Sequence, residues 1–237
     1  MTASGPAKAF LLAAGLGTRL RPLTNKTPKC LIPIGGKPLL HWWLVICKRL
    51  GVREVLINTH HLADQVRDFA KSQDSSVRIK LFHEDSLLGS AGTIAANKDF
   101  VDDESDFWIF YADTLIGADL MPLALLHRAT KSDLTLGLFQ SLDPKSGGVV
   151  ELSKTGEILS FEEKPKNPKS NLVAAGVYVG GPELLNALPA GAGDLSKDVY
   201  PKLMNNACGL ILDPVLDLGT PESYAHALRE WDHFGFR

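Results

Sequence analysis

The sequence predicts an α/β fold built on a mainly parallel sheet. Short apolar runs alternate in the first half of the chain with longer segments that carry apolar residues at helical spacing. Strands that alternate with helices in this way pair in parallel, because each helix returns the chain to the same end of the sheet. After about residue 147 the pattern changes, and short strand-like runs separated by turns follow one another directly.

The predicted strands of the first half are mainly apolar runs. The first, AFLLAA, has no polar residue and is followed by Gly15, as expected of a parallel strand that is buried on both faces. Four later runs, EVLINTH, RIKLFH, DFWIFYA and LTLGLF, have the same character. The sequence therefore predicts five buried strands, at residues 9–14, 54–60, 78–83, 106–112 and 134–139.

Helical segments lie between these strands. The segment from Pro38 to Leu50 is apolar and has basic residues just before Gly51, which is typical of the end of a helix. Residues 62–72 are amphipathic, so one face of that helix is expected to pack on the sheet. Two more helices are predicted in the remaining gaps, at residues 90–100 and 120–131.

The second half is expected to extend the same sheet with antiparallel strands. Its predicted strands are residues 147–153, 156–165 and 172–181, and its predicted helices are residues 182–188, 196–203 and 221 to about 233. There is no long linker, repeat or low-complexity tract. We therefore expect one domain over residues 1–237, whose second half, from about residue 147, covers what the first half, to about residue 146, binds.

Composition and charge exclude several classes of protein. The chain has 237 residues, of which 45% are hydrophobic and 22% charged, and its formal net charge is −2. Proteins that hold duplex DNA usually have a basic excess, so a nucleic acid partner is not expected. The apolar runs are too short to span a membrane, and we interpret the first as a strand and not as a signal peptide. The three scattered cysteines fit no zinc or disulfide pattern, which predicts reduced thiols in a cytoplasmic protein.

The loop after the first strand, within LLAAGLGTRLRPLTNKTPK, combines glycines with positive charge. Ligands of open α/β sheets bind at the carboxyl ends of the strands, where this loop begins. Gly15 and Gly17 would let the backbone approach a phosphate, Arg19 could grip phosphate oxygens and Lys29 supplies a point charge. Glycines alone are a weak signal, because the loop lacks the third glycine of the dinucleotide fingerprint and the G-K-[ST] of a P-loop.

The longer run LAAGLGTRLRPLTNKTPKCLIPIGGKPLL resembles a family signature. It is similar to that of the sugar-1-phosphate nucleotidyltransferases, or nucleotide-sugar pyrophosphorylases, in which (A/G)-G-x-G-T-R-L-x-P-L-T is followed by P-K and K-P. Further similar motifs are LGSAGTI, YAD, GGVVE, FEEKP, AAGVYV and LDLGTPESY, so the resemblance covers essentially the whole chain. It implies a Rossmann-like sheet with a nucleotide-binding first half and a sugar-binding second half.

The resemblance also implies a reaction and the residues that perform it. A phosphate oxygen of a sugar 1-phosphate would attack the α-phosphorus of a nucleoside triphosphate (NTP) and release pyrophosphate. Arg19 would hold the leaving β- and γ-phosphates, and Lys29 the α-phosphate or the incoming sugar phosphate. Asp113, in YAD, and Asp217, in LDLGTP, would be ligands of the cofactor Mg²⁺, which prefers carboxylate and phosphate oxygens.

Other residues of the matching motifs would contact the two substrates. At the nucleotide we expect Leu12, Ala13, Ala14, Gly15, Gly17, Thr18, Arg19, Glu84, Gly89, Ser90, Ala91, Gly92 and Thr93. At the sugar we expect Gly148, Glu163, Lys164 and Ala174. Ala174 replaces an Asn of the family, which leaves the identity of the sugar open. Ala112 replaces a Gly, which is tolerated if this position does not need a positive φ.

The base and the sugar are the least determined features. Glu84 and Asp85 precede the loop that lies against the base in the family, and a carboxylate can accept hydrogen bonds from N1–H and N2–H₂ of guanine. This favours GTP, with mannose 1-phosphate or a manno-configured heptose 1-phosphate as acceptor. A uridylyl- or thymidylyltransferase for another hexose 1-phosphate and a non-catalytic nucleotide-sugar sensor are alternatives, although a sensor needs no pair of metal carboxylates. A homo-oligomer is left open.

Overall fold

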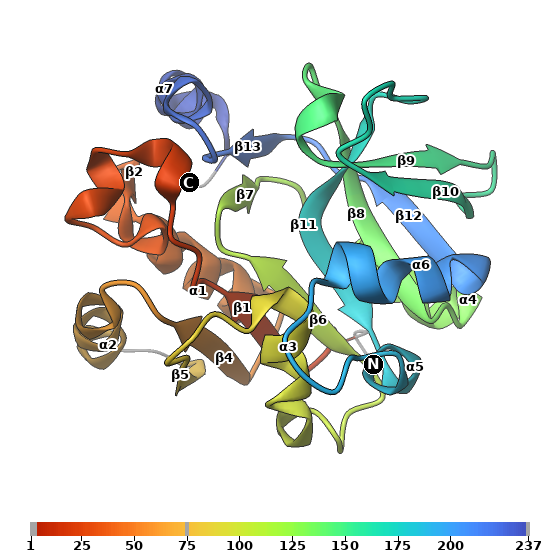
Figure 1. Cartoon of the computed structure of the whole chain (residues 1–237), viewed down its shortest axis with the longest axis horizontal. Helices are drawn as coiled ribbons and strands as arrows, with labels where there is room; N and C mark the ends of the chain where they lie inside the picture. The colour runs from red at the N-terminus through yellow and green to blue at the C-terminus, as the bar shows by residue number, and fades with distance from the viewer. Residues whose placement is uncertain (1–3, 74–75, 236–237) are drawn as a thin grey trace.

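β1 (Lys8–Leu12) lies inside a nine-stranded mixed sheet in the computed structural model, which describes residues 4–73 and 76–235 (Figure 1). The sheet order is β10-β9-β11-β6-β1-β4-β5, and β8 joins it by pairing with β11 and β12. The other strands are β4 (Glu54–Thr59), β5 (Arg78–His83), β6 (Phe107–Tyr111), β8 (Leu134–Gln140), β9 (Gly148–Leu152), β10 (Ile158–Glu163), β11 (Leu172–Gly180) and β12 (Ala207–Ile211).

Four of the five strands expected in the first half pair in parallel, as β6-β1-β4-β5. The fifth, β8, is instead antiparallel to β11 and parallel to β12, because β11 from the second half is inserted beside β6. β5 is also not buried on both faces as expected. It forms an edge of the sheet, and Arg78 and Lys80 are exposed on it.

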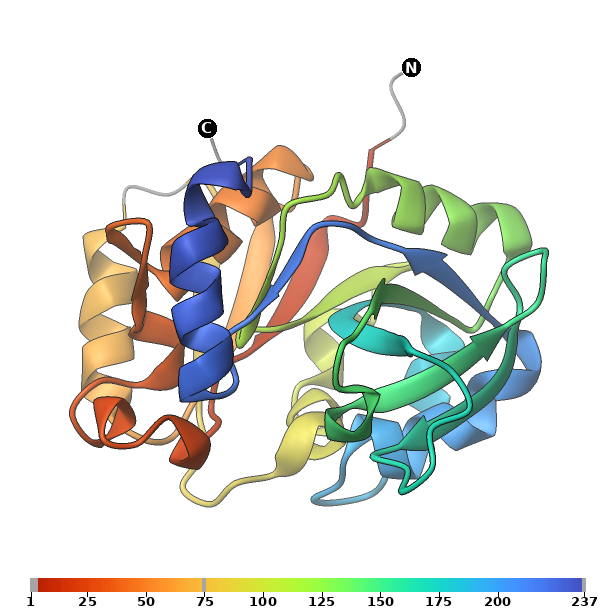
Figure 2. The same cartoon turned by 90° about the horizontal axis from the view of Figure 1, so that it is seen from above.

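Helices cover both faces of the sheet, as the sequence predicts (Figures 1 and 2). Along β1, Ala9 and Leu11 enter one hydrophobic core and Phe10 enters the other, because successive side chains of a strand point to opposite faces. The first core includes residues of α1 (Leu39–Arg49), α2 (Ala63–Ser72), α4 (Met121–Thr130) and α7 (Pro221–Glu230). The second includes residues of α3 (Gly89–Ala95), α5 (Pro182–Asn186), the π-helical turn Leu195–Val199 and α6 (Tyr200–Leu203).

The expected helices are present, and some end earlier than predicted. The segment 90–100 forms α3 only to Ala95 and continues as a 3₁₀ helix, Lys98–Phe100. The last helix, α7, ends at Glu230 and is followed by a 3₁₀ helix, Trp231–His233. No helix of the described part of the chain has the length and apolar character that crossing a membrane requires.

The second half adds the expected antiparallel extension, β9, β10 and β11, but it also returns to the first half. Two short two-stranded sheets were not expected: β2 (Pro33–Ile34) with β3 (Lys37–Pro38), and β7 (Thr114–Ile116) with β13 (Val215–Asp217). α7 lies beside the N-terminal elements (Figure 2), and Tyr224 Oη of this helix donates to Pro33 O at 2.6 Å. The two halves therefore interleave, and the β7–β13 sheet is one of the points where they meet.

Candidate active site

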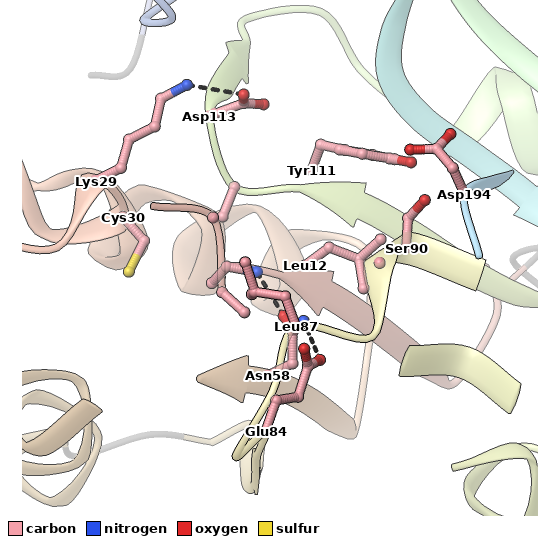
Figure 3. A pocket seen from close by; sticks show the side chains of 15 residues that line it. Leu12, Lys29, Cys30, Asn58, Glu84, Leu87, Ser90, Tyr111, Asp113 and Asp194 are labelled. Carbon is pink, nitrogen blue, oxygen red and sulfur yellow. Dashed lines mark hydrogen bonds and ion pairs between the residues drawn. The ribbon is translucent and has the colours of Figure 1, made fainter. Parts of the chain in front are cut away.

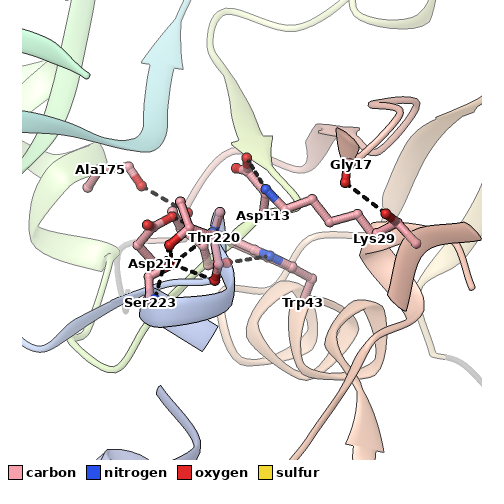
Figure 4. Close-up of polar contacts among 11 residues, drawn as sticks. Gly17, Lys29, Trp43, Asp113, Ala175, Asp217, Thr220 and Ser223 are labelled. Carbon is pink, nitrogen blue, oxygen red and sulfur yellow. Dashed lines mark hydrogen bonds and ion pairs between the residues drawn. The ribbon is translucent and has the colours of Figure 1, made fainter. Parts of the chain in front are cut away.

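Lys29 and Asp113 form an ion pair at the carboxyl ends of the central strands. Asp113 follows β6, and Lys29 begins a 3₁₀ helix, Lys29–Leu31, at the end of the loop after β1. Lys29 Nζ lies 2.8 Å from Asp113 Oδ2 (Figure 4). Because Lys29 is only 9% exposed, its ammonium group depends on Asp113 for charge compensation.

Asp217 joins this pair through the two-stranded β7–β13 sheet. The two strands are antiparallel and place Asp217 opposite Thr114, the residue after Asp113. Thr114 is anchored from two sides, since Trp43 Nε1 donates to its carbonyl oxygen at 3.0 Å and its hydroxyl donates to Ala175 O at 3.1 Å (Figure 4). The sheet thus brings together two carboxylates that are far apart in the sequence.

The two carboxylates have opposite pKa shifts. Burial opposes the ionisation of Asp113, but the charges of Lys29 and Arg19 outweigh it, and the pKa of Asp113 lies below its usual value. The pKa of Asp217 is raised by loss of hydration and by the charge of Asp113. Asp217 as a whole remains exposed, so repulsion from Asp113 is the cause that matters for the site. The site therefore favours an additional positive charge beside Asp217.

Arg19 reaches the same corner of the site. A methyl group added at Gly219 would lie 2.9 Å from Asp217 Oδ1 and 3.3 Å from Arg19 Nη2. The carboxylate and the guanidinium group therefore lie close together over this glycine, whose N–H donates to Asp217 Oδ1 at 2.9 Å. All four residues expected to be catalytic, including Lys29 and Asp113, are thus gathered in one place.

A cavity of about 270 Å³ lies beside the ion pair (Figure 3). Lys29 and Asp113 lie toward one side of it, and Asn58 and Glu84 toward the opposite side. The residues of the predicted nucleotide site that line it are Leu12, Ala13, Ala14, Gly15, Glu84, Gly89 and Ser90. The loop after β1 and the start of α3 therefore enclose a space next to the positive charges.

Gly17, Thr18 and Arg19 do not line this cavity. They belong to the loop after β1, beyond the residues that line it. Gly17 has a φ of 61°, and its carbonyl oxygen accepts a hydrogen bond from Thr24 Oγ1 at 2.8 Å. A side chain at this position would meet Thr24 at 2.7 Å, so both the conformation and the space require glycine. Thr18 and Arg19 follow as exposed residues of the 3₁₀ helix Thr18–Leu20.

α3 forms one wall of the cavity. Gly89 and Ser90 line the cavity, whereas residues 91–93 are buried behind them. The amides of Ala91 and Gly92 both donate to the carbonyl oxygen of Gly193, at 2.9 and 3.3 Å. These N–H groups are therefore used by the protein itself in this conformation.

Glu84 lines the cavity, but protein donors surround its carboxylate. The residue is 2% exposed. Its Oε1 accepts hydrogen bonds from Asn58 Nδ2 at 2.8 Å and Thr93 Oγ1 at 2.6 Å, and its Oε2 accepts one from Leu88 N at 3.0 Å. The expected contact of both oxygens with guanine does not fit this arrangement. Asp85 is exposed and does not line the cavity, so base recognition by these two acids stays a prediction.

The residues expected at the sugar lie on β9, β10 and β11 or, in the case of Lys164, directly after β10, outside the lining of the cavity. Gly148 pairs with Glu163 across the β9–β10 ladder, and a side chain at Gly148 would lie 3.1 Å from Glu163 Oε2. Lys164 has a φ of 50°, which is strained for a residue with a side chain, and its N–H donates to Gly147 O at 2.9 Å. Ala174 lies on the neighbouring strand β11.

Tyr178 connects this group to the cavity. Its pKa is raised first by burial and then by the charges of Glu163, Asp113 and Asp194. Glu163 belongs to the expected sugar residues, whereas Asp113 and Asp194 line the cavity. The charges of both groups of residues therefore reach the same buried tyrosine.

Asp113 and Asp217 are the residues that could hold a metal ion. Within residues 4–73 and 76–235, no three or more His, Cys, Asp or Glu side chains form a group that could hold an ion by themselves. Mg²⁺ is commonly held by one or two carboxylates together with substrate phosphates. The two carboxylates, already close to the cations Lys29 and Arg19, fit an Mg²⁺ ion that arrives with a nucleotide.

Asn58, Tyr111 and Asp194 line the cavity but were not predicted. Asn58 and Tyr111 are polar residues near the carboxyl ends of the buried strands β4 and β6, and this position could have indicated them. Asp194 caps the turn Leu195–Val199, where its Oδ1 accepts from Ser196 N at 2.9 Å. No periodicity marks Asp194, because its place in the site depends on tertiary structure alone.

Known proteins share this sequence pattern. The family described as "Nucleotidyl transferase" matches residues 8–232. A UTP–glucose-1-phosphate uridylyltransferase from Synechocystis sp. is 34% identical over 94% of this chain and 62% of its own length. A protein of Oryza sativa subsp. japonica, named "Probable mannose-1-phosphate guanylyltransferase 1", is 30% identical over 94% of this chain and 64% of its own length. The chain thus spans about three fifths of the length of these curated relatives.

A solved structure shares the fold. HddC from Yersinia pseudotuberculosis, complexed with GMP-PN, matches with a TM-score of 0.80 and 22% identity. The match covers 95% of this chain and 99% of that one. The predicted α/β architecture is confirmed by this agreement and by the observed sheet.

Proposed function

Because the chain belongs to the nucleotidyl transferase family, we propose that it transfers a nucleotidyl group from an NTP to a sugar 1-phosphate. An oxygen of the sugar phosphate forms a bond to the α-phosphorus, the bond from the α-phosphorus to the oxygen bridging to the β-phosphate breaks, and pyrophosphate leaves. The observation that carries this proposal is the Lys29–Asp113 ion pair, which lies beside Asp217 and next to the cavity.

Lys29 and Arg19 bring two anions together in this mechanism. Lys29 contacts the α-phosphate or the incoming sugar phosphate, and Arg19 holds the leaving β- and γ-phosphates. Cations fixed in advance stabilise the charge that develops on the reacting oxygens without having to reorganise during the reaction. The cavity supports this proposal, because Lys29 and the backbone of Ala13 to Gly15 line the same space.

Asp113 and Asp217 would hold Mg²⁺ together with the substrate phosphates. Bound there, the ion would offset phosphate charge and polarise the reacting phosphate. Lys29 Nζ lies 2.8 Å from Asp113 Oδ2, so a phosphate held beside Asp113 would also be within reach of the ammonium group of Lys29.

Glu163, Lys164, Gly148 and Ala174 form the sugar side of the site. The carboxylate of Glu163 accepts hydrogen bonds from sugar hydroxyls, and Lys164 pairs with the sugar phosphate. Lys164 Nζ is exposed and lies 3.8 Å from Glu163 Oε1, so both groups are available on the same surface. The positive φ of Lys164 supports this role, because strained backbone is concentrated at functional sites.

GTP and mannose 1-phosphate, or a manno-configured heptose 1-phosphate, are the proposed substrates. The name of the rice relative supports guanine and mannose. UTP or dTTP with a glucose-type 1-phosphate is the second candidate, and the name of the Synechocystis relative supports it.

Pyrophosphate release should be measured with four NTPs and a panel of sugar 1-phosphates in the presence of Mg²⁺. We expect the highest kcat/KM with GTP and mannose 1-phosphate or manno-heptose 1-phosphate. A preference for UTP or dTTP with glucose 1-phosphate would establish the second candidate instead. Nucleotide binding without release of pyrophosphate from any pair would show a sensor and overturn the proposed activity.

A further inference from the structure

Glu84 is a buried carboxylate without a cationic partner. It is 2% exposed, and no Lys, Arg or His side chain in the described part of the chain forms an ion pair with it. A buried carboxylate is costly unless hydrogen bonds compensate its charge. The groups around Glu84, which itself lines the cavity, must therefore supply that compensation through hydrogen bonds.

Three donors converge on this carboxylate, and Figure 3 shows the contact with one of them, Asn58. They are Asn58 Nδ2 at 2.8 Å, Thr93 Oγ1 at 2.6 Å and Leu88 N at 3.0 Å. An ionised carboxylate only accepts hydrogen bonds, so it can satisfy all three donors at once. A glutamine would turn an NH₂ group toward at least one of them, which explains why an acid is suited to this position.

Asn58 connects Glu84 to the loop after β1 through hydrogen bonds. Its Oδ1 accepts a hydrogen bond from Ala13 N at 2.6 Å. On the other side of the same peptide group, Leu12 O accepts from Ala112 N at 3.0 Å. The Leu12–Ala13 peptide is thus fixed from both sides, and its orientation sets that of the loop residues that line the cavity.

We propose that Glu84 and Asn58 are positioning residues for the nucleotide. The Glu84 carboxylate fixes Leu88 directly and Ala13 through Asn58, so it holds the two backbone segments that enclose the nucleotide, and it does not select the base. This inference rests on the proposed function, because it takes the ligand of the cavity to be an NTP. Glu84 then controls affinity for all NTPs alike.

Binding and kinetic measurements on matched variants test this role. Glu84→Gln, Asn58→Ala and Thr93→Val each remove one member of the network, whereas Thr93→Ser keeps the hydroxyl group. The control is Asp68→Asn, the same acid-to-amide change at an exposed position of α2. We expect each of the first three variants to raise, about tenfold, the Kd and the KM of every NTP that the protein binds. The KM of the sugar 1-phosphate should not change. Thr93→Ser should raise these values less than Thr93→Val does, and Asp68→Asn should stay within about threefold of the unchanged protein.

The double variant Asn58→Ala/Glu84→Gln provides a test even if only one NTP binds. Residues of one network show non-additive effects, so the Kd of the double variant for the NTP should be no more than about twofold above that of the weaker-binding single variant. If the two losses of affinity multiply instead, Glu84 and Asn58 do not act as one network. A different result would show that Glu84 recognises guanine directly. In that case Glu84→Gln would weaken the binding of GTP at least about tenfold more than that of UTP, while Asn58→Ala would weaken the binding of both equally.

Hydrogen exchange of single amides, measured without nucleotide, separates this inference from the proposed function. Asn58→Ala should speed the exchange of the Ala13 amide, and Glu84→Gln that of the Leu88 amide, relative to Asp68→Asn. Unchanged exchange in both variants would overturn the positioning role. Protected amides in a protein that binds no NTP would instead overturn the proposed function and leave the network as structural support.

Discussion

Lys29 Nζ lies 2.8 Å from Asp113 Oδ2, so the cation proposed to act at the reacting phosphate is held by a carboxylate proposed to bind the metal. The charges of Lys29 and Arg19 overcome the effect of burial and keep the pKa of Asp113 low, so this carboxylate is ionised at neutral pH. Asp217, whose pKa is raised, completes the group across the two-stranded β7–β13 sheet.

Lys29→Ala should reduce kcat far more than it raises the KM for the NTP. The ammonium contact strengthens as charge develops on the reacting phosphate, so we expect a fall in kcat of about 100-fold or more and a KM change of a few-fold. Steady-state kinetics measure both values. Lys26→Ala, an exposed lysine of the same loop, serves as the control. An unchanged kcat with a raised KM would reduce Lys29 to a binding group.

Asp113→Asn and Asp217→Asn should each weaken the use of Mg²⁺. Each substitution removes a charged ligand, so we expect a lower kcat and a rise of about tenfold or more in the Mg²⁺ concentration that gives half-maximal activity. Mg²⁺ titrations at saturating NTP measure this shift, with Asp102→Asn on the exposed surface as the control. Full activity of the unchanged protein in EDTA would contradict the metal role.

Gly219→Ala should lower activity without unfolding the protein. The added methyl group would lie 2.9 Å from Asp217 Oδ1 and 3.3 Å from Arg19 Nη2, so both groups must shift by a few tenths of an ångström. Small misplacements of reacting groups are costly, and we expect kcat to fall by about tenfold while the melting temperature changes little. Gly191→Ala is the control, because its methyl group would meet nothing within 4 Å. Equal activities of the two variants would count against the placement of Asp217.

The cysteines should be unreactive in the native protein. Cys30, Cys47 and Cys208 are buried. Burial raises the pKa of Cys30 and Cys47 to about 12, so these two remain protonated thiols at pH 8. A thiol reagent such as DTNB should label the folded protein slowly and all three cysteines after unfolding. Rapid labelling of a native cysteine would show that the core opens more readily than the structure implies.

Local sequence information identified the loop after β1, because Gly15, Arg19 and Lys29 lie in one continuous run after an apolar strand. Asp113 and Asp217 could be paired only through the family resemblance, since β7 and β13 have three residues each and are too short to show a period. The direction of β8 was missed because periodicity does not specify a pairing partner, and β11 takes the place beside β6.

The contacts of Glu84 were also beyond sequence analysis. Its three donors come from β4, from the turn before α3 and from α3 itself, so only the folded chain brings them to one carboxylate. The acidic pair Glu84–Asp85 suggested two similar groups. The fold buries the first in a hydrogen-bond network and leaves the second exposed.

Transfer of labelled phosphorus from the preferred NTP tests the proposed reaction most directly. The NTP is labelled with ³²P at the α- or the γ-position and incubated with the sugar 1-phosphate, Mg²⁺ and the protein, and the products are separated by chromatography. If the sugar phosphate attacks the α-phosphorus, the α-label appears in the nucleotide sugar and the γ-label appears in pyrophosphate. A γ-label found on the sugar, or an α-label found only in free nucleotides, would contradict nucleotidyl transfer.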